Sequence, residues 1–342
     1  MVTLEAGAAP RIAAAAPRPD YAVGWWLLCV CALVVLMILV GGATRLTDSG
    51  LSITEWRPVT GAIPPLSASD WASEFAKYQA TTEYQLQNAG MSLAEFQTIY
   101  WWEWGHRLLG RLIGLVYALP FLWFLLAGRL KGRAAALSGL LLLGGLQGFV
   151  GWWMVESGLV DRLDVAPYRL AAHLGLAFLI LGFGFWLALG AFGVPRARFG
   201  WPAGAFLGLL FMQILAGAAV AGSDAGKAYA DWPTIGGEAF PSTYAALSPF
   251  WHNLFENHAA VQFNHRSLGY LVALCALALG ALAWRRGRRR LGGALAAGAL
   301  AQAFLGVATV LGAAPLGLSL AHQGGAAALW LLALAHLRFG LR

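Results

Sequence analysis

The feature that most constrains this fold is a series of eight apolar stretches, each close to the length that a helix needs to cross a bilayer. Such a helix takes about 20 predominantly apolar residues. Charged residues make up only 11% of the chain, against roughly 25% in soluble domains. We therefore predict an all-α integral membrane protein with eight transmembrane helices. They lie near residues 24–43, 105–127, 134–155, 167–190, 202–221, 264–284, 291–312 and 319–337.

The charges between these stretches indicate how the chain is oriented. The connections after the second, fourth and sixth stretches are short and basic, whereas the long connections at 44–104 and 222–263 hold most of the acidic residues. Because Lys and Arg favour the cytoplasmic side, we expect both termini in the cytoplasm, with residues 1–23 as an N-terminal tail. The net charge of +7 is distributed as topology signals of this kind, so it does not indicate binding to nucleic acid.

The two halves of the chain repeat each other, with an offset that shrinks along the sequence. The loops therefore differ in length, while the helices keep theirs. The matched segments are 42–65 with 218–241 (offset 176), 106–110 with 265–269 (159), 146–151 with 301–306 (155) and His173 with His322 (149).

The repeat predicts how the helices are grouped. Each half holds an even number of spans, so both halves insert the same way up. We expect two four-helix bundles related by a pseudo-two-fold axis. The N-terminal half covers 24–190, the C-terminal half covers 202–342, and a cytoplasmic linker at 191–201 joins them.

Four of the seven histidines occupy equivalent positions in the repeat, near the outer ends of the even-numbered helices. They are His106, His173, His265 and His322. An ionisable group within a spanning segment is costly and marks a functional site by default. Two neutral imidazoles on facing helices at one depth can be the axial ligands of a haem iron, so each half is a candidate haem site. The alternatives are histidines that bind lipid headgroups, or a copper or zinc centre, for which the sequence has no local His or Cys cluster.

Arginines near these histidines are candidates for contacts with haem propionates, because Arg forks suit carboxylates. They are Arg45, Arg107, Arg111 and Arg266. Long side chains that reach lipid phosphates are the alternative. Glycines in the same bundle would leave room for a flat macrocycle, although ordinary helix packing uses glycine in the same way. These glycines are Gly105, Gly110, Gly114, Gly144, Gly148, Gly151 and Gly175.

The two copies differ chemically at one position. Glu103 stands three residues before His106, on the same helical face, and Gln262 stands three residues before His265. A carboxylate beside a macrocycle can take up protons or stabilise a developing cation. The first half is therefore the candidate reactive half and the second a permanent holder. The alternative for Glu103 is a solvated charge favoured by the dipole of a helix start.

The other polar residues have simpler expected roles. We expect His252 and His258 to be solvated in the second outer loop, and His336 to face water or headgroups at the cytoplasmic end of the last helix. Asp48 and Asp224 are expected to be turn residues. The three cysteines all lie inside apolar stretches, so we expect no disulfide.

The residues above resemble those of the haem A synthase family, membrane enzymes of bacteria and mitochondria that oxidise haem O to haem A. The resemblance covers essentially all of residues 24–337, and the long first outer loop with the segment 96–100 is similar to the proteobacterial and mitochondrial branch. It rests on 41–52 (GGATRLTDSGLS), 55–61 (EWRPVTG), the 103–111 motif, Gln147 with Gly148, His173, 264–266 (NHR), and His322 with Gln323.

The resemblance implies a protein with two haems. His265 and His322 match the family's ligands of a resident haem b, while His106 and His173 match the residues on either side of the haem O substrate. The family's catalytic glutamate falls on Glu103. The implied reaction takes one ring methyl of haem O to an alcohol and then to a hydrated aldehyde, which loses water to give haem A. Some bacterial members carry a cysteine pair in the first outer loop, and this chain has none there.

The expectation is thus a haem-O-oxidising oxidoreductase of the bacterial inner membrane that supplies haem A to terminal oxidases, with its haem sites toward the periplasm. Expected partners are haem O, membrane lipid, haem O synthase, an electron acceptor and a second copy of the chain. A di-haem b electron-transfer cytochrome is the alternative function, but it does not account for the difference between Glu103 and Gln262. A transporter would place polar residues near the midplane, whereas here they gather at the outer ends.

Overall fold

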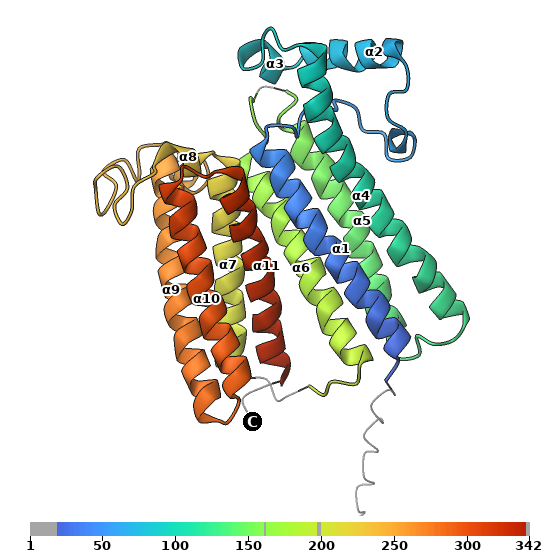
Figure 1. Ribbon diagram of the computed structural model, residues 1–342, viewed down its shortest axis with the longest axis vertical. Helices are drawn as coiled ribbons and strands as arrows, with labels where there is room; N and C mark the ends of the chain where they lie inside the picture. Colours follow the sequence, from blue (N-terminus) through green and yellow to red (C-terminus); the bar gives the residue numbers. More distant parts are fainter. Residues whose placement is uncertain (1–18, 161, 197–199, 340–342) are drawn as a thin grey trace, which may run out of the picture.

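The computed structural model describes residues 19–160, 162–196 and 200–339. Within these residues the chain forms helices joined by turns and irregular segments, with one isolated bridge between Ile235 and Glu238. Eight helices are long and apolar enough to cross a membrane, so the predicted fold class is confirmed (Figure 1). The spans are α1 (Tyr21–Leu46), α4 (Leu93–Leu126), α5 (Ala134–Glu156), α6 (Pro167–Ala191), α7 (Trp201–Gly222), α9 (His258–Arg285), α10 (Arg289–Leu311) and α11 (Leu316–Phe339).

Both long outer connections contain short helices. The first holds η1 (Thr60–Ala62), α2 (Ala68–Gln79) and α3 (Thr82–Leu86), and the second holds α8 (Ala225–Ala228) and η2 (Phe250–Leu254). In Figure 1, α2 and α3 lie above the outer end of α4, beyond the level at which the other spans end. Most of the expected N-terminal tail, and residues 197–199 of the expected linker, fall outside the described residues.

Two spans begin more than one helical turn earlier than the sequence analysis predicts. The helix expected at 105 begins at Leu93, and the helix expected at 264 begins at His258. The added turns of α4 are not apolar throughout. They are stabilised by a capping box in which Ser92 and Glu95 bond each other's backbone N–H groups, and by packing against α2. Hydropathy alone misses helix that is held by caps and tertiary contacts.

An aromatic cluster joins these outer turns of α4 to the first outer loop. Phe96 and Tyr100 of α4 are buried against Tyr78 and Trp71 of α2. The rings of Tyr78 and Phe96 are stacked with centroids 5.2 Å apart, and those of Trp71 and Tyr100 meet edge to face at 5.0 Å. Such pairs contribute beyond the area that they bury. The first long loop therefore forms a packed module at the end of α4 that extends beyond the level at which the other spans end (Figure 1).

The two halves meet along four central helices, α1 and α6 from one half and α7 and α11 from the other. Trp330 of α11 donates from Nε1 to the Phe178 carbonyl of α6 at 2.9 Å. Gly182 of α6 lies where a Cβ would come within 2.7 Å of the Trp330 ring. Gln323 of α11 donates to the Ile38 carbonyl of α1 at 2.9 Å. These contacts leave α4 and α5 on one flank, and α9 and α10 on the other (Figure 1).

The flanking helices pack differently in the two halves. α9 and α10 lie close together along their length, whereas α4 and α5 touch only sparingly. Gly280 and Gly292 bring the backbones of α9 and α10 together, because a Cβ on Gly280 would lie 2.7 Å from the Gly292 carbonyl oxygen. In α5, a Cβ on Gly144 or Gly148 would meet nothing within 4 Å. The N-terminal half is thus the more open of the two.

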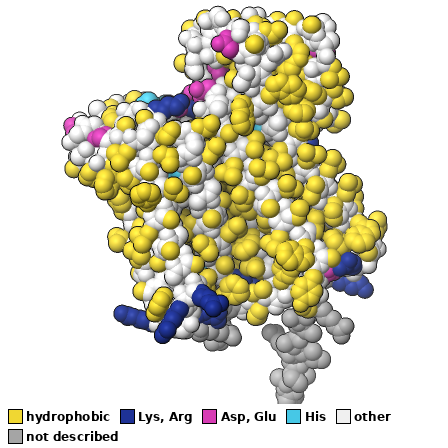
Figure 2. All heavy atoms as spheres, in the orientation of Figure 1, with side chains coloured by type: hydrophobic (Ala, Val, Ile, Leu, Met, Phe, Trp, Pro, Cys, Tyr) yellow, Lys and Arg dark blue, Asp and Glu magenta, His cyan; other side chains and the backbone are white. Residues whose placement is uncertain are grey.

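The polar surface is divided between the two ends of the bundle. Figure 2 shows Lys and Arg side chains at the end opposite α2 and α3, and an apolar belt between the ends. His336 lies toward that basic end, but its expected exposure is wrong, because it is 1% exposed. The neighbouring Arg338 is also buried, with its guanidinium 4.6 Å from the centre of the Trp186 ring. A residue near the end of a spanning helix can therefore be buried when that helix end packs against the other half of the protein, even though its position in the sequence predicts contact with water or headgroups.

The close approach of α9 and α10 leads to a stability prediction. Alanine at Gly280 should push the two helices apart and destabilise the protein by about 1–3 kcal/mol, measured as a lower thermal midpoint of the detergent-solubilised chain. Gly139 of α5 is the matched control, because a Cβ there meets nothing within 4 Å. Gly139→Ala should leave the midpoint unchanged or slightly higher, since alanine favours helix. Equal effects of both substitutions would contradict the packing difference.

Candidate functional site

Each of the four candidate histidines has its ring against a glycine of a neighbouring helix. A Cβ on any of these glycines would lie 3.0 Å from the imidazole. The glycines of the two halves are separated by the offsets 176 and 155 found in the sequence repeat. The pairs are Gly41 of α1 with His106 of α4, Gly151 of α5 with His173 of α6, Gly217 of α7 with His265 of α9, and Gly306 of α10 with His322 of α11.

In the C-terminal half the two rings face each other across a gap. The ring centroids of His265 and His322 are 6.2 Å apart, and the ring planes are perpendicular at 89°. Imidazole nitrogens bind metals at about 2.0–2.1 Å, so two imidazoles on opposite sides of one metal have centroids roughly 6 Å apart. Nδ1 of His265 is buried without a hydrogen-bond partner among the described residues. The pair therefore fits the axial ligands of a haem iron.

A glutamine on the preceding helix orients one histidine in each half. Gln302 of α10 places Nε2 3.1 Å from Nδ1 of His322 and 2.8 Å from the His322 carbonyl oxygen. Gln147 of α5 makes the same contacts with His173, at 3.2 Å and 3.0 Å. A hydrogen-bonded partner of this kind fixes the direction of a ligand ring.

Glu103 is buried and accepts four hydrogen bonds. Its side chain is 3% exposed. Ser52 Oγ and the Ile53 N–H each donate to Oε2 at 2.7 Å, and Arg107 donates to Oε1 from Nε at 3.0 Å and from Nη2 at 2.6 Å. All four groups are donors, so a carboxylate satisfies each of them. The expected alternative, a solvated charge at a helix start, does not describe this residue, because it lies eleven positions after Ser92, the N-cap of α4.

Gln262 holds the equivalent loop in the second half with the opposite hydrogen-bond chemistry. Its Nε2 donates to the carbonyls of Ala225 and Tyr229, in the connection after α7. Its Oε1 accepts from Arg266. Glu103 and Gln262 therefore both attach an outer loop to a spanning helix. Only the first places a carboxylate in this position.

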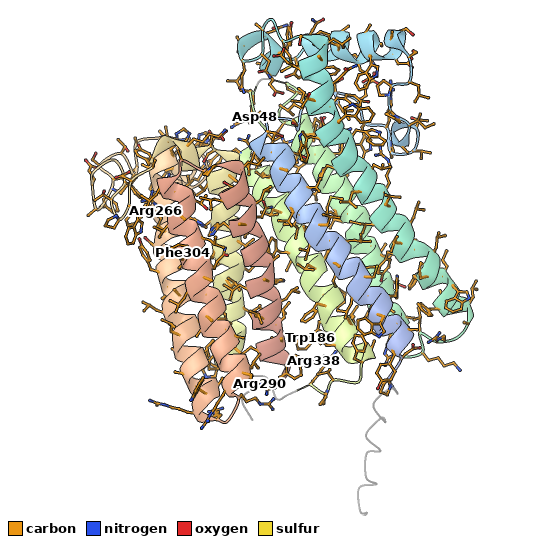
Figure 3. The ribbon with its side chains drawn as sticks, in the orientation of Figure 1. Asp48, Trp186, Arg266, Arg290, Phe304 and Arg338 are labelled. Atoms are coloured by element: carbon orange, nitrogen blue, oxygen red, sulfur yellow. The ribbon has the colours of Figure 1, made fainter. Side chains whose placement is uncertain are left out.

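The arginines of the repeated frame donate mainly to loop carbonyls. Arg107 donates to the carbonyls of Ile53 and Glu55 at 2.8 Å and 3.0 Å. Arg266, labelled in Figure 3, donates to those of Asp231 and Thr234 at 2.9 Å and 2.7 Å. Arg111, one turn further along α4, bonds the carbonyls of Arg57 and Pro58. These side chains anchor the loops to the helix ends.

Arg45 lies at the junction of the two halves, among three carboxylates. It contacts Asp48 at 2.9 Å, Asp164 at 3.3 Å and Asp224 at 2.5 Å; Asp48 is labelled in Figure 3. Burial raises the pKa of Asp164. Burial also raises that of Asp224, but the charge of Arg45 and the bonds from Arg45 and Lys227 lower it overall. Asp48 and Asp224 have φ near +50°, as their expected turn role requires. They also pair with Arg45, which the sequence analysis did not foresee.

A cavity of about 210 Å³ lies at the outer end of the N-terminal half. It is bounded by Ile53, Glu55 and Arg107 on one side, and by Trp152 and Glu156 of α5 on the other. The cavity reaches the Arg107 side chain that holds Glu103. It is large enough for several water molecules or for the charged edge of a bound ligand.

Sequence reasoning missed several residues that shape the site. Ser52 was not singled out, although its hydroxyl bonds Glu103. Gly41, Gly217 and Gly306 were not assigned a place beside the histidines, although the repeat offsets link each to a counterpart in the other half. Of the glycines that were chosen, Gly175 packs against the side chain of Leu215 of α7, where a Cβ would come within 2.6 Å. It therefore belongs to the contact between the halves.

The chain has extensive similarity to known proteins. The sequence profile of the COX15-CtaA family, described as cytochrome oxidase assembly protein, matches residues 24–334. A heme A synthase from Maricaulis maris (strain MCS10) is 55% identical over 322 residues, which is 92% of this chain and 94% of the relative.

Two further relatives agree with this match. A heme A synthase from Parvibaculum lavamentivorans is 48% identical over 321 residues, covering 92% of this chain and 93% of the relative. One from Azorhizobium caulinodans is 51% identical over 340 residues, covering 95% of each.

The loop anchors can be tested by hydrogen exchange. Arg107→Ala removes the bonds to Ile53, Glu55 and Glu103. Since hydrogen bonds to charged groups contribute about 1.5–3 kcal/mol, the Ile53 amide should exchange at least about tenfold faster, followed by mass spectrometry. Arg111→Ala is the control and should accelerate exchange around Arg57 only. Unchanged protection of Ile53 in the Arg107 variant would show that other contacts hold this loop.

Proposed function

This chain belongs to the COX15-CtaA family of cytochrome oxidase assembly proteins, and from that membership we propose that it is a haem A synthase. It is a membrane oxidoreductase that converts a ring methyl of haem O, through an alcohol, to the formyl group of haem A. One observation supports the assignment of roles to particular residues. Each half has a pair of histidines, and the residue three positions before the first histidine is a buried carboxylate, Glu103, in the N-terminal half and an amide, Gln262, in the C-terminal half.

We place a resident haem b in the C-terminal half. His265 and His322 are its proposed ligands, supported by their facing rings 6.2 Å apart and by the glycine behind each ring. When bound, this haem would carry electrons away from the substrate. Gln302 would keep His322 turned toward the iron through its contact with Nδ1. The close packing of α9 and α10 is in keeping with a permanently occupied site.

The substrate haem O is assigned to the N-terminal half, between His106 and His173. The sparse contact between α4 and α5, and the open space beside Gly144 and Gly148, leave room there for a ligand that must enter and leave. Gln147 orients His173 as Gln302 orients His322. The equivalent contacts in the two halves support our proposal that they are related by a pseudo-two-fold axis.

Glu103 is the proposed catalytic residue. Its carboxylate lies one helical turn outward of His106, and Ser52, Ile53 and Arg107 hold it in place. A fixed carboxylate can accept a proton from the reacting methyl or alcohol group and can stabilise positive charge that develops on the ring. Gln262, its counterpart, can do neither.

We propose that the arginines contact the haem propionates through those N–H groups that do not bond the loops. Among the described residues, Arg45 Nε, Arg111 Nη1 and Arg266 Nε are buried without a hydrogen-bond partner. Arg107 reaches the outer cavity. A carboxylate at these positions would satisfy the free donors. The charge distribution supports a bacterial inner-membrane location with both termini cytoplasmic and both haems toward the periplasm.

The catalytic role of Glu103 can be separated from its loop contacts. Glu103→Gln should keep the haem absorption spectrum of the purified protein and reduce haem A formation by about 10²-fold or more, measured by mass spectrometry of porphyrins from cells that supply haem O. Ser52→Ala removes one bond to the carboxylate and leaves its charge. It should lower conversion far less.

Two outcomes would contradict this role. Conversion by Glu103→Gln at the rate of the unmodified protein would remove Glu103 from catalysis. Equal losses in Glu103→Gln and Ser52→Ala would assign it to loop attachment alone.

The two haem sites should respond differently to ligand removal. His322→Ala should abolish the low-spin spectrum of the resident haem, and Gln302→Ala should weaken haem retention roughly 10–100-fold. His173→Ala should keep that spectrum and lose conversion of haem O. Loss of the resident haem in the His173 variant, with retention in the His322 variant, would reverse the assignment of the two halves.

A further inference from the structure

Glu83 is a buried carboxyl group that neither the proposed reaction nor the fold explains. It is the second residue of the short helix α3, in the outer module above α4. It is 3% exposed, and its Oε2 has no hydrogen-bond partner among the described residues. Burial of a charged carboxylate oxygen without a hydrogen-bond partner is energetically costly. The neutral, protonated form of Glu83 is therefore favoured.

The charged groups that act most strongly on Glu83 are acidic. They are Asp164 in the connection before α6, Glu103 of α4 and Asp48 after α1, and the hydroxyl of Tyr78 of α2 also interacts with it. Burial, together with the charges of the three carboxylates, raises the pKa of Glu83 to about 8, and the hydrogen bond from Tyr78 opposes this rise. At neutral pH the group is thus mainly protonated, and it ionises as the pH rises through about 8.

The carboxylates on either side of Glu83 differ from it in being paired with arginine. Glu103 is paired with Arg107 at 2.6 Å, and Asp48 and Asp164 are both paired with Arg45. Glu83 therefore differs from these neighbours in having a buried oxygen, Oε2, with no hydrogen-bond partner among the described residues.

The carboxylates around Glu83 differ in their exposure to water. The side chain of Glu103 is 3% exposed, whereas those of Asp48 and Asp164 are 35% and 40% exposed. The helix of Glu83 is also in contact with the loop that carries Asp164, because Thr82 Oγ1 donates to the Val160 carbonyl at 3.4 Å. The carboxylates that act on Glu83 therefore range from the buried candidate site to the partly exposed loops.

We propose that Glu83 is a proton-transfer residue that exchanges protons between the Glu103 site and the outer aqueous phase by way of Asp164 and Asp48. The proposal rests on the proposed function. In that function, oxidation of the alcohol releases protons inside a site that is enclosed by loops and helices. In each transfer an O–H bond of one carboxyl or water breaks as another forms, and no electrons move. Glu83 acts through Glu103 and does not touch the substrate.

The protonation state of Glu83 can be measured without turnover. Infrared titration of the full-length protein should show a protonated-carboxyl C=O band that disappears with a midpoint near pH 8, and Glu83→Gln should abolish it. Tyr78→Phe should move the midpoint upward, because Tyr78 lowers the pKa of Glu83. Glu55→Gln is the control and should leave the band in place. Burial raises the pKa of Glu55, but Lys77 and Arg57 lower it overall.

The pH profile of conversion tests the role itself. The unmodified protein should show an inflection near pH 8 in its rate of haem A formation. Glu83→Gln should remove this inflection, slow haem A formation at least about tenfold and leave the haem spectrum unchanged. A band that persists in Glu83→Gln, or an unaltered rate and profile in that variant, would overturn the proposal. If the unmodified protein formed no haem A at any pH, the proposed function would fail instead, so the two failures are distinguishable.

Discussion

The bilayer's lack of hydrogen-bonding partners is the constraint on which the rest of this structure depends. A chain that crosses hydrocarbon must satisfy its backbone polar groups within each segment, so all eight spans are helices. The same constraint confines costly ionisable groups to places where the protein provides partners. Glu103, Arg107 and Arg45 accordingly lie at the outer helix ends, where loop carbonyls and carboxylates surround them. The chemistry of the protein is therefore concentrated in a layer near the outer surface.

Within that layer, one architecture serves two purposes. In both halves a histidine rests on a glycine, and a residue three positions earlier attaches the outer loop to the helix. The loop can be held by a carboxylate that accepts hydrogen bonds or by an amide that donates them. In our proposal, the carboxylate adds a negative charge beside the N-terminal haem site, whereas the amide does not. On that assignment, a single difference between the repeats distinguishes a reactive half from a holding half without a change of fold.

The spans and the four histidines could be predicted from sequence because both depend on local or repeated patterns. Runs of about 20 apolar residues have few alternatives to a membrane helix, and the repeat aligns His106 with His265 and His173 with His322. The early starts of α4 and α9 could not be predicted in this way, because capping and packing hold those turns. His336 was placed wrongly because its burial depends on neighbouring helices that are distant in sequence.

The arginines show where residue type alone misleads. The sequence pattern indicated ligands for propionates, but most of their N–H groups bond loop carbonyls or aspartates. Only the three-dimensional arrangement separates the donors that are used from those that remain free. Ser52 and the Ile53 amide were likewise hidden, because they approach Glu103 from a loop about 50 residues away.

The central claim is that one half holds haem b and the other processes haem O. It is tested most directly by extracting the porphyrins from the purified, unmodified protein and identifying them by mass. The account predicts haem B together with haem O, its hydroxylated form or haem A. Haem B alone, in an amount that fills both sites, would contradict it and indicate a di-haem electron-transfer cytochrome.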